Sequence, residues 1–246
     1  MANRFSLRER LMMLLIILLI ATVYLQDSGF LRPTSTQVVI DRFHKLFYDS
    51  GIWVTTKWLG VPTGQNPNDA WIHQEIIVTT KPDFIVEAGT LFGGSAALWA
   101  TILQQVNPDG RVITIDIKDQ ASAAKNLPIV KDKVDFLIGS SVDRAIVEEV
   151  TKRVKGKKVL VILDSDHSKD HVLAEMKAYA SLVSKDSYLI VQDTNVNGHP
   201  VLEKFGPGPM EAVNEFLATN DEFHRDREAE RLMFTMHPKG YLKKIR

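Results

Sequence analysis

Residues 84–95 read FIVEAGTLFGGS, in which a short apolar run is followed by an acidic residue and a glycine-rich turn. Four more apolar runs of similar length follow along the chain, and segments with helical spacing separate them. The runs lie at 112–115, 134–138, 159–163 and 188–191, and the helices near 94–106, 142–153 and 169–182, with a weaker crossover near 120–128. Nearly continuous apolar strands that alternate with helices indicate a parallel sheet with both faces covered.

The expected fold class is therefore α/β, with a doubly wound, mostly parallel, seven-stranded sheet. A helix is expected near 209–219, after a loop rich in glycine and proline. Two weaker strands, near 222–226 and 231–236, complete the sheet.

The N-terminal third carries two further segments with helical spacing. One covers 36–49, and the other runs to about Thr80 from a cap at Asn68 or Asp69. The expected organisation is an N-terminal hydrophobic segment at 1–27, a helical extension at 28–80 and the α/β domain at 81–246.

The composition excludes several classes of protein. The 246 residues contain 30 basic and 30 acidic side chains, and this zero balance argues against a nucleic-acid partner, which needs clustered basic surface. No cysteine is present. Disulfides, zinc–thiolate sites, iron–sulfur clusters and cysteine nucleophiles are therefore ruled out.

Residues 11–25 contain no charged side chain and read LMMLLIILLIATVYL. As a helix they span about 22 Å, less than the ~30 Å hydrocarbon core of a bilayer. No small-residue cleavage site follows the run, so an uncleaved membrane anchor is favoured over a cleaved signal peptide. Three basic residues on each side leave the orientation open.

The expected ligand site lies at the carboxyl ends of the strands, where open α/β sheets bind their ligands. The turn after the first strand has the spacing G-x-x-x-G-G, and Glu87 precedes its first glycine by two positions. A pyrophosphate prefers bare N–H groups, whereas a carboxylate suits a ligand with an ammonium group or hydroxyls. Asp116 ends the second strand 22 positions after Gly94, close to the ~20-residue offset of an acid that accepts from ribose hydroxyls. Together these features favour a nucleoside ligand.

Ser140 follows the third strand and is placed to face an adenine, while Ser141 or Asp143 is expected to cap the next helix. For each of these residues taken alone, an ordinary turn, cap or solvated loop remains an alternative.

Asp164 and Asp193 follow the fourth and fifth strands, so we expect both at the same edge of the sheet. Two adjacent carboxylates repel each other unless a cation or a proton lies between them. Oxygen ligands of this kind suit Mg²⁺ or Mn²⁺. His167 lies three positions after Asp164, within reach of a substrate proton. Helix capping for the aspartates and a surface position for the histidine are the alternatives.

The residues from about 53 to 246 resemble the cephalosporin hydroxylase family, which includes rhamnosyl O-methyltransferases. The implied fold is that of Rossmann-like S-adenosylmethionine-dependent methyltransferases. The resemblance is carried by Trp58-Leu59-Gly60, Lys81-Pro82-Asp83, Glu87-Ala88-Gly89-Thr90 with Gly93-Gly94-Ser95, Asp164-Ser165-Asp166-His167, Asp193-Thr194-Asn195, Gly206-Pro207-Gly208-Pro209 with Glu211-Ala212, and Pro238-Lys239-Gly240-Tyr241-Leu242.

This resemblance implies a cofactor, S-adenosylmethionine, and assigns residues to it. Its methionine part would be held by Glu87 and the turn residues Gly89, Thr90, Gly93, Gly94 and Ser95. Asp116 would hold the ribose and Ser140 would face the adenine. Asp164 is assigned both to the cofactor and to a divalent metal.

The metal set implied by the resemblance is Asp164, Gln192 and Asp193. The family tends to have an acid where this chain has Gln192, so the site has one negative charge fewer and the need for metal stays open. His167 would be the catalytic base that takes the proton of the acceptor, a sugar or glycolipid hydroxyl. Because S-adenosylmethionine is made in the cytosol, the catalytic domain is expected there, on a membrane-associated chain.

Two other functions remain open at this point. The first is an oxidoreductase, either a nicotinamide enzyme or an iron hydroxylase as the family name suggests. The second is a non-catalytic, membrane-tethered binding protein. A homo-oligomer is also left open.

Overall fold

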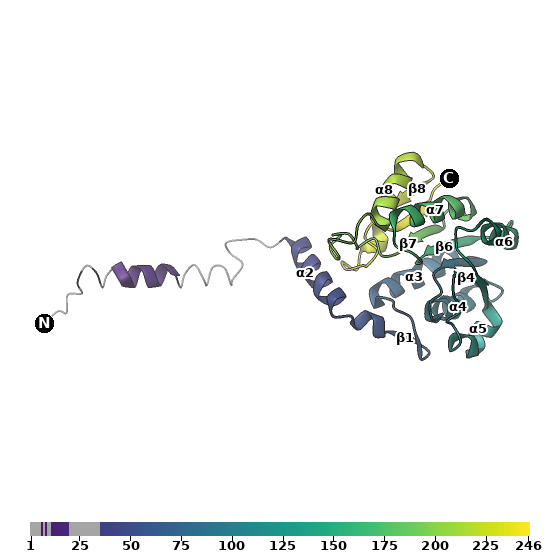
Figure 1. Cartoon of the computed structure of the whole chain (residues 1–246), viewed down its shortest axis with the longest axis horizontal. Coiled ribbons are helices and arrows are strands. Elements are labelled where there is room, and N and C mark those ends of the chain that lie inside the picture. The colour runs from purple at the N-terminus through teal and green to yellow at the C-terminus, as the bar shows by residue number, and fades with distance from the viewer. Residues whose placement is uncertain (1–5, 7, 9–10, 20–34) are drawn as a thin grey trace. The chain divides into compact units, whose positions relative to one another are not determined.

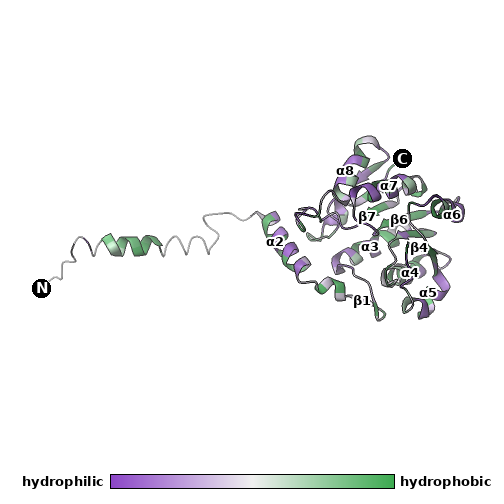
Figure 2. Ribbon diagram, viewed as in Figure 1, coloured by the Kyte–Doolittle hydropathy of each residue, from purple (hydrophilic) through white to green (hydrophobic). Residues whose placement is uncertain are grey.

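The computed structural model describes residues 6, 8, 11–19 and 35–246, and the chain divides into two compact units, Met1–Phe43 and His44–Arg246 (Figure 1). In the first unit, residues 11–19 are helical and their apolar side chains are exposed; Figure 2 shows the hydrophobic character of this stretch. Among the described residues, no helix has both the length and the apolar character needed to cross a bilayer. Residues 20–25 of the predicted anchor lie outside the described part of the chain.

The second unit contains the predicted seven-stranded sheet. Its strands are β3 (Phe84–Ala88), β4 (Arg111–Asp116), β5 (Val134–Ile138), β6 (Val159–Leu163), β7 (Tyr188–Val191), β8 (Phe223–Arg225) and β9 (Tyr241–Lys244). Their spatial order is β5-β4-β3-β6-β7-β9-β8. The first five strands pair in parallel, and β9 pairs antiparallel with both β7 and β8. The α/β class and the mostly parallel sheet are confirmed.

Helices cover both faces of this sheet. They are α3 (Pro67–Thr80), α4 (Gly94–Val106) and α5 (Pro128–Lys133) on one face, and α6 (Arg144–Val154), α7 (Lys169–Tyr179) and α8 (Pro209–Thr219) on the other. The central strand β6 explains this double cover. All five of its residues are buried, and successive side chains pack into the hydrophobic cores on opposite faces of the sheet. Val161 packs with the second group of helices, and Ile162 packs with the first. A parallel strand of this kind needs cover on both sides.

Short 3-10 turns complete the unit: η1 (Ile52–Thr55), η2 (Ala124–Asn126), η3 (Ala180–Leu182) and η4 (Glu228–Glu230). The helix predicted over 36–49 is found as α2 (Thr36–Asp49), which begins in the first unit and ends in the second. The cap of α3 is Asn66, whose side chain accepts from the Asn68 N–H, and not Asn68 or Asp69 as expected.

The strand predicted at 231–236 is wrong, and the chain's last strand is β9. The backbone N–H of Met236 and the hydroxyl of Thr235 both donate to the buried carboxylate of Asp69 on α3. The backbone N–H of Met236 is therefore not available to a strand ladder, and residues 231–236 form a loop beside α3.

A small hairpin of β1 (Lys57–Trp58) and β2 (Val61–Pro62) packs on the glycine-rich turn. Leu59 and Gly60, between the strands, both have positive φ, as tight hairpin turns of type I′ require. A Cβ at Gly94 would lie 2.1 Å from the carbonyl oxygen of Pro62, so the hairpin lies directly against the start of α4. Residues 44–80 thus belong to the same compact unit as the sheet.

We predict that Gly94→Ala destabilises the protein, because the added methyl group collides with the Pro62 backbone. The expected loss is about 1–3 kcal/mol of unfolding free energy, measured by urea denaturation. Gly156→Ala is the control, because a Cβ there meets nothing within 4 Å and the φ of +73° is the only source of strain. Equal losses in the two variants would contradict the packing of the hairpin on the turn.

Candidate functional site

The site forms where the strand order reverses, between β3 and β6. Gly89 follows β3 with a φ of +101°, and a Cβ at this position would lie 1.9 Å from the carbonyl oxygen of Asp164 at the end of β6. Only glycine permits this close approach of two backbones. The chain therefore turns away from β3 tightly, and a cavity opens beyond the strand ends.

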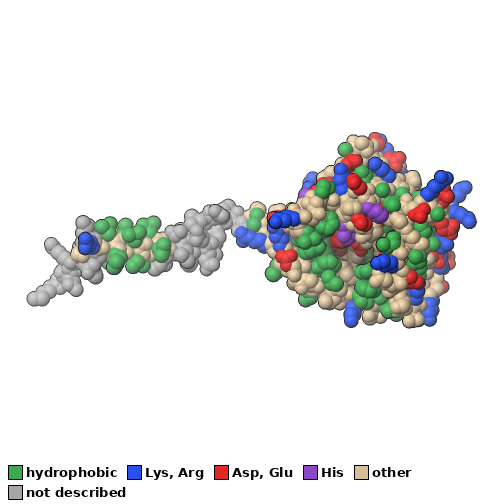
Figure 3. All heavy atoms as spheres, in the orientation of Figure 1, with side chains coloured by type: hydrophobic (Ala, Val, Ile, Leu, Met, Phe, Trp, Pro, Cys, Tyr) green, Lys and Arg blue, Asp and Glu red, His purple; other side chains and the backbone are tan. Residues whose placement is uncertain are grey.

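The cavity has a volume of about 560 Å³ and receives residues from the ends of all five parallel strands. Its wall contains all the predicted site residues except Glu87 and Gly93: Gly89, Thr90, Gly94, Ser95, Asp116, Ser140, Asp164, His167, Gln192 and Asp193. Figure 3 shows histidine and acidic side chains around a hollow in this face of the molecule. The topology thus brings the predicted cofactor and metal residues to one place.

Glu87 lies behind this wall. Its side chain is buried and accepts hydrogen bonds from Trp99 Nε1 at 2.8 Å and from the Thr114 hydroxyl at 2.6 Å. Burial outweighs these hydrogen bonds and raises the pKa of Glu87 to about 7. Gly93 has a φ of +78° and precedes α4, where a Cβ would lie 2.8 Å from that of Ala124.

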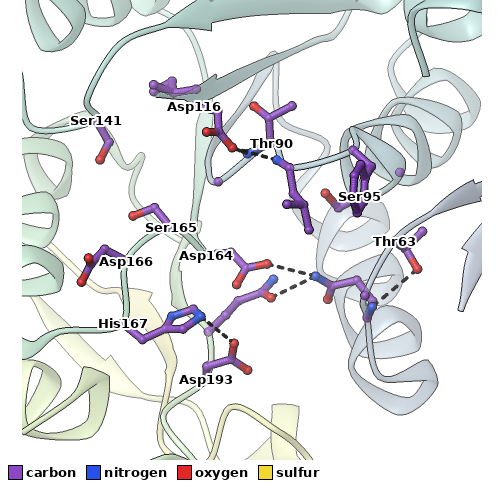
Figure 4. Close-up of a pocket in the computed structure, with 18 of the residues that line it drawn as sticks. Thr63, Thr90, Ser95, Asp116, Ser141, Asp164, Ser165, Asp166, His167 and Asp193 are labelled. Atoms are coloured by element: carbon purple, nitrogen blue, oxygen red, sulfur yellow. Dashed lines mark hydrogen bonds and ion pairs between the residues drawn. The ribbon is translucent and has the colours of Figure 1, made fainter. Parts of the chain in front are cut away.

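Asp116 organises the half of the cavity that contains the residues predicted to bind the cofactor, which we call the cofactor half. Its Oδ2 accepts from the backbone N–H groups of Thr90, at 3.1 Å, and Leu91, at 2.8 Å, so the carboxylate fixes the glycine-rich turn (Figure 4). Ser140 also lines the cavity. Asp143 is the cap of α6, accepting from the Ala145 N–H at 3.1 Å.

Asp164, His167 and Asp193 form the other half of the cavity, with one ligand atom of each lying within 4.8 Å of the others (Figure 4). His167 Nε2 lies 3.1 Å from Asp193 Oδ2. Burial and the nearby charge of Asp193 raise the pKa of Asp164 well above its usual value. Burial works against a charged His167, but the hydrogen bond to Asp193 and the surrounding carboxylates outweigh it and raise its pKa to about 9. The cluster therefore favours bound positive charge.

Gln192 is hydrogen-bonded to Gln65, which does not follow any strand of the sheet and was not predicted from the sequence. Its Oε1 accepts from Gln65 Nε2 at 3.1 Å, and the same Nε2 donates to Asp164 Oδ2 at 3.2 Å. Gln65 belongs to the loop between β2 and α3. An amide from the N-terminal part of the unit thus bridges the ends of β6 and β7.

The C-terminal tail holds Asp193 in place. Asp193 has a φ of +53°, and its backbone N–H donates to Nδ1 of the buried His237 at 2.9 Å. His237 in turn follows Met236, whose N–H is bound by Asp69 at 2.8 Å. The tail motif at 238–242 hinted at this region, but nothing local in the sequence points to His237.

Comparison with known proteins identifies the family. Residues 50–245 match the family model described as Rhamnosyl O-methyltransferase/CmcI. The chain belongs to this family. Rhamnosyl O-methyltransferases of Mycobacterium tuberculosis (strain ATCC 25618 / H37Rv) and Mycobacterium leprae (strain TN) are 40% and 36% identical to it over 223 and 218 residues. These matches cover 87% and 86% of this chain, and 87% and 92% of the relatives.

Solved structures share the fold at lower identity. A CmcI structure with Mg and SAM has a TM-score of 0.60 at 18% identity, over 78% of each chain. The O-methyltransferase from Bacillus cereus, in complex with SAH, has a TM-score of 0.53 at 16% identity, over 82% of this chain and 86% of that one. The Rossmann-like methyltransferase fold is confirmed. Family membership also confirms the expected enzyme class, an S-adenosylmethionine-dependent O-methyltransferase.

The donor set of the cluster also bears on the hydroxylase alternative. An iron hydroxylase of the facial-triad type uses two histidines and one carboxylate. Within the described part of the chain, the cluster is Asp164, His167 and Asp193, with one histidine and two carboxylates. This composition is the reverse of the triad and is consistent with the family's transferase chemistry.

We predict that Glu87→Gln changes how stability depends on pH. Between its usual pKa of 4.5 and the raised value of about 7, folded Glu87 binds more protons than the unfolded chain does. The free energy of unfolding of the unaltered protein therefore falls as the pH rises through this window. The variant lacks this contribution, so its stability relative to the unaltered protein should increase by up to about 3 kcal/mol between pH 5 and pH 8.

Urea denaturation at pH 5 and pH 8 measures the unfolding free energy of both proteins. Any effect of the substitution that does not depend on pH cancels when the two pH values are compared. Glu148→Gln, at an exposed position on α6, controls for the loss of one carboxylate. A relative stability of Glu87→Gln that is unchanged or lower at pH 8 would show that the raised pKa is wrong.

Proposed function

We propose that the protein transfers the methyl group of S-adenosylmethionine to a hydroxyl group of a sugar, with a rhamnoside as the first acceptor to test. The observation that carries this proposal is the 40% identity to rhamnosyl O-methyltransferases, which extends over 87% of both chains. The cavity supports it, because it joins a nucleoside-type half to a carboxylate and histidine half.

The cofactor half has the groups that the nucleoside needs. Asp116 offers carboxylate oxygens to the ribose hydroxyls, and Ser140 offers a hydroxyl to the adenine. The turn at Gly89 and Thr90 allows the methionine part close to the backbone. Glu87 supports this turn from behind through its hydrogen bonds to Thr114 and Trp99.

The acidic half fits a divalent cation. Asp164 and Asp193 bring two partly buried carboxylates together, and positive charge between or beside them relieves their mutual repulsion. We propose that these two residues hold Mg²⁺ or Mn²⁺. Gln192 adjoins them, although its Oε1 is engaged by Gln65. When bound, the cation lowers the pKa of a hydroxyl next to it.

His167 is the proposed general base. In the transfer, the acceptor oxygen attacks the methyl carbon, the carbon–sulfur bond breaks and S-adenosylhomocysteine leaves. The hydroxyl proton passes to the imidazole, which must first be neutral. In the neutral tautomer whose Nε2–H donates to Asp193, the lone pair of His167 is on Nδ1, and Nδ1 takes the proton of the acceptor. The Asp193 hydrogen bond therefore orients the ring.

We expect His167→Ala to lower kcat for methyl transfer to methyl α-L-rhamnopyranoside by about 10²–10⁴-fold, the usual worth of a positioned base. Transfer of label from S-adenosylmethionine measures the rate, and S-adenosylhomocysteine affinity should stay the same. His224→Ala, at an exposed position on β8, is the control. A variant with full activity would remove His167 from the mechanism.

The metal part of the proposal has a separate test. Treatment with a chelator should lower the rate of methyl transfer, and added Mg²⁺ or Mn²⁺ should restore it. Equal rates with and without chelator would contradict a catalytic cation but leave the methyl transfer itself standing.

We also propose that residues 11–25 attach the protein to a membrane, with the catalytic unit on the cytosolic side where the cofactor is made. The exposed apolar side chains at 11–19 support this. Removal of residues 1–27 should move the protein from the membrane fraction to the soluble fraction. An unchanged distribution would contradict the anchor.

A further inference from the structure

Gln65 and His237 each bring to the cavity a buried polar side-chain atom that has no hydrogen-bond partner among the described residues, and Gln65 is the one that contacts Asp164. Its side chain is buried at 5% exposure, and it lines the cavity together with Thr63 and Asn66. Its Oε1 is buried and has no hydrogen-bond partner among the described residues. A buried acceptor without a donor is costly, and a ligand or an ordered water in the adjoining cavity would supply the missing donor.

The two contacts of its amide nitrogen fix the direction of this oxygen. Nε2 donates to Asp164 Oδ2 at 3.2 Å and to Gln192 Oε1 at 3.1 Å. With Asp164 ionised and the Gln192 amide in the orientation shown, exchanging the nitrogen and oxygen of the Gln65 amide would bring three oxygens together, so the assignment shown is the favourable one. Oε1 is the amide atom that remains for a ligand.

The loop that carries Gln65 is held by its own hydrogen bonds. The Thr56 hydroxyl donates to the Gln65 carbonyl oxygen at 3.0 Å, and it lies 2.8 Å from the Thr63 hydroxyl. The β1–β2 hairpin just before the loop is fixed against Gly94. Gln65 is therefore positioned before any ligand arrives, which reduces the entropic cost of using it for binding.

The location of Gln65 indicates which ligand it meets. Its partners end β6 and β7, in the half of the cavity that contains His167 and Asp193, whereas the expected ribose contact ends β4. Figure 4 shows Asp116 and Thr90 on one side of Asp164, and His167 and Asp193 on the opposite side. The side-chain amide of Gln65 thus lies in the half of the cavity where the acceptor is expected.

We propose that Gln65 is a specificity-determining residue that accepts a hydrogen bond from a hydroxyl of the sugar acceptor other than the one that is methylated. This inference rests on the proposed function and deepens it. The N-terminal loop would then select a polyhydroxylated ring, while the strand ends supply the chemistry.

The test compares the unaltered protein with Gln65→Met, which keeps the length of the side chain and removes both polar atoms of the amide. The acceptors are methyl α-L-rhamnopyranoside and its monodeoxy analogues, each lacking one hydroxyl. We expect Gln65→Met to raise the KM for the parent rhamnoside roughly tenfold, from the loss of one buried hydrogen bond. The affinity for S-adenosylhomocysteine should change less than twofold, which also reports that the variant is folded.

The analogues provide the decisive comparison. In the unaltered protein, one deoxy analogue should have a KM roughly tenfold higher than that of the parent, whereas Gln65→Met should bind this analogue and the parent equally. Gln65→Glu, which keeps an acceptor oxygen, should retain part of the discrimination. Gln105→Met, at an exposed position on α4, is the control for the substitution.

Three results would overturn the inference. If the ratio of each deoxy analogue's KM to that of the parent is the same in the unaltered protein and in Gln65→Met, Gln65 does not bind a sugar hydroxyl. If the variant lowers the affinity for S-adenosylhomocysteine and leaves the KM of the rhamnoside unchanged, the Gln65 oxygen faces the cofactor. If the unaltered protein transfers no methyl group to the rhamnoside while it binds S-adenosylhomocysteine, the acceptor in the proposed function is wrong, and the inference fails with it.

Discussion

The contact of Gly89 with the backbone of Asp164 is the constraint on which the site depends. It lies at the reversal of strand order, where β4 continues on one side of β3 and β6 lies on the other. A side chain at Gly89 would separate these strand ends. Because there is none, the turn that faces the cofactor half and the carboxylate of the acidic half lie within one cavity. The short distance between them is what a direct transfer from cofactor to acceptor requires.

The two halves of the cavity differ in how their carboxylates are used. Oδ2 of Asp116 accepts from two backbone N–H groups, which rigidifies the turn, and the carboxylate keeps acceptor capacity for a ligand hydroxyl. Asp164 and Asp193 lie close together and are partly buried, and their charges raise the pKa of His167 to about 9 against the effect of burial. The same repulsion between the two carboxylates underlies the proposed cation site. Glu87, although acidic, lies behind the wall and acts on the cavity through its neighbours.

The sequence predicted most of the sheet and the strand-end residues because these signals are local. Apolar runs define the buried strands, and the residue after each run must lie at the sheet's carboxyl edge. The sequence could not place Gln65 or His237, which reach the site through contacts more than 40 positions apart in the chain. The incorrect strand at 231–236 has the same origin, because the polar groups of that segment are bound by Asp69 on a distant helix.

The most direct test of the account is a crystal structure of the protein with S-adenosylhomocysteine. We predict that the ribose hydroxyls meet Asp116 and that the sulfur atom lies between the Gly89 turn and Asp164. The space beside His167 and Asp193 should remain open for the acceptor. A nucleoside bound outside this cavity, or with its ribose beside Asp193 and its sulfur remote from Asp164, would contradict the division of the site into these two halves.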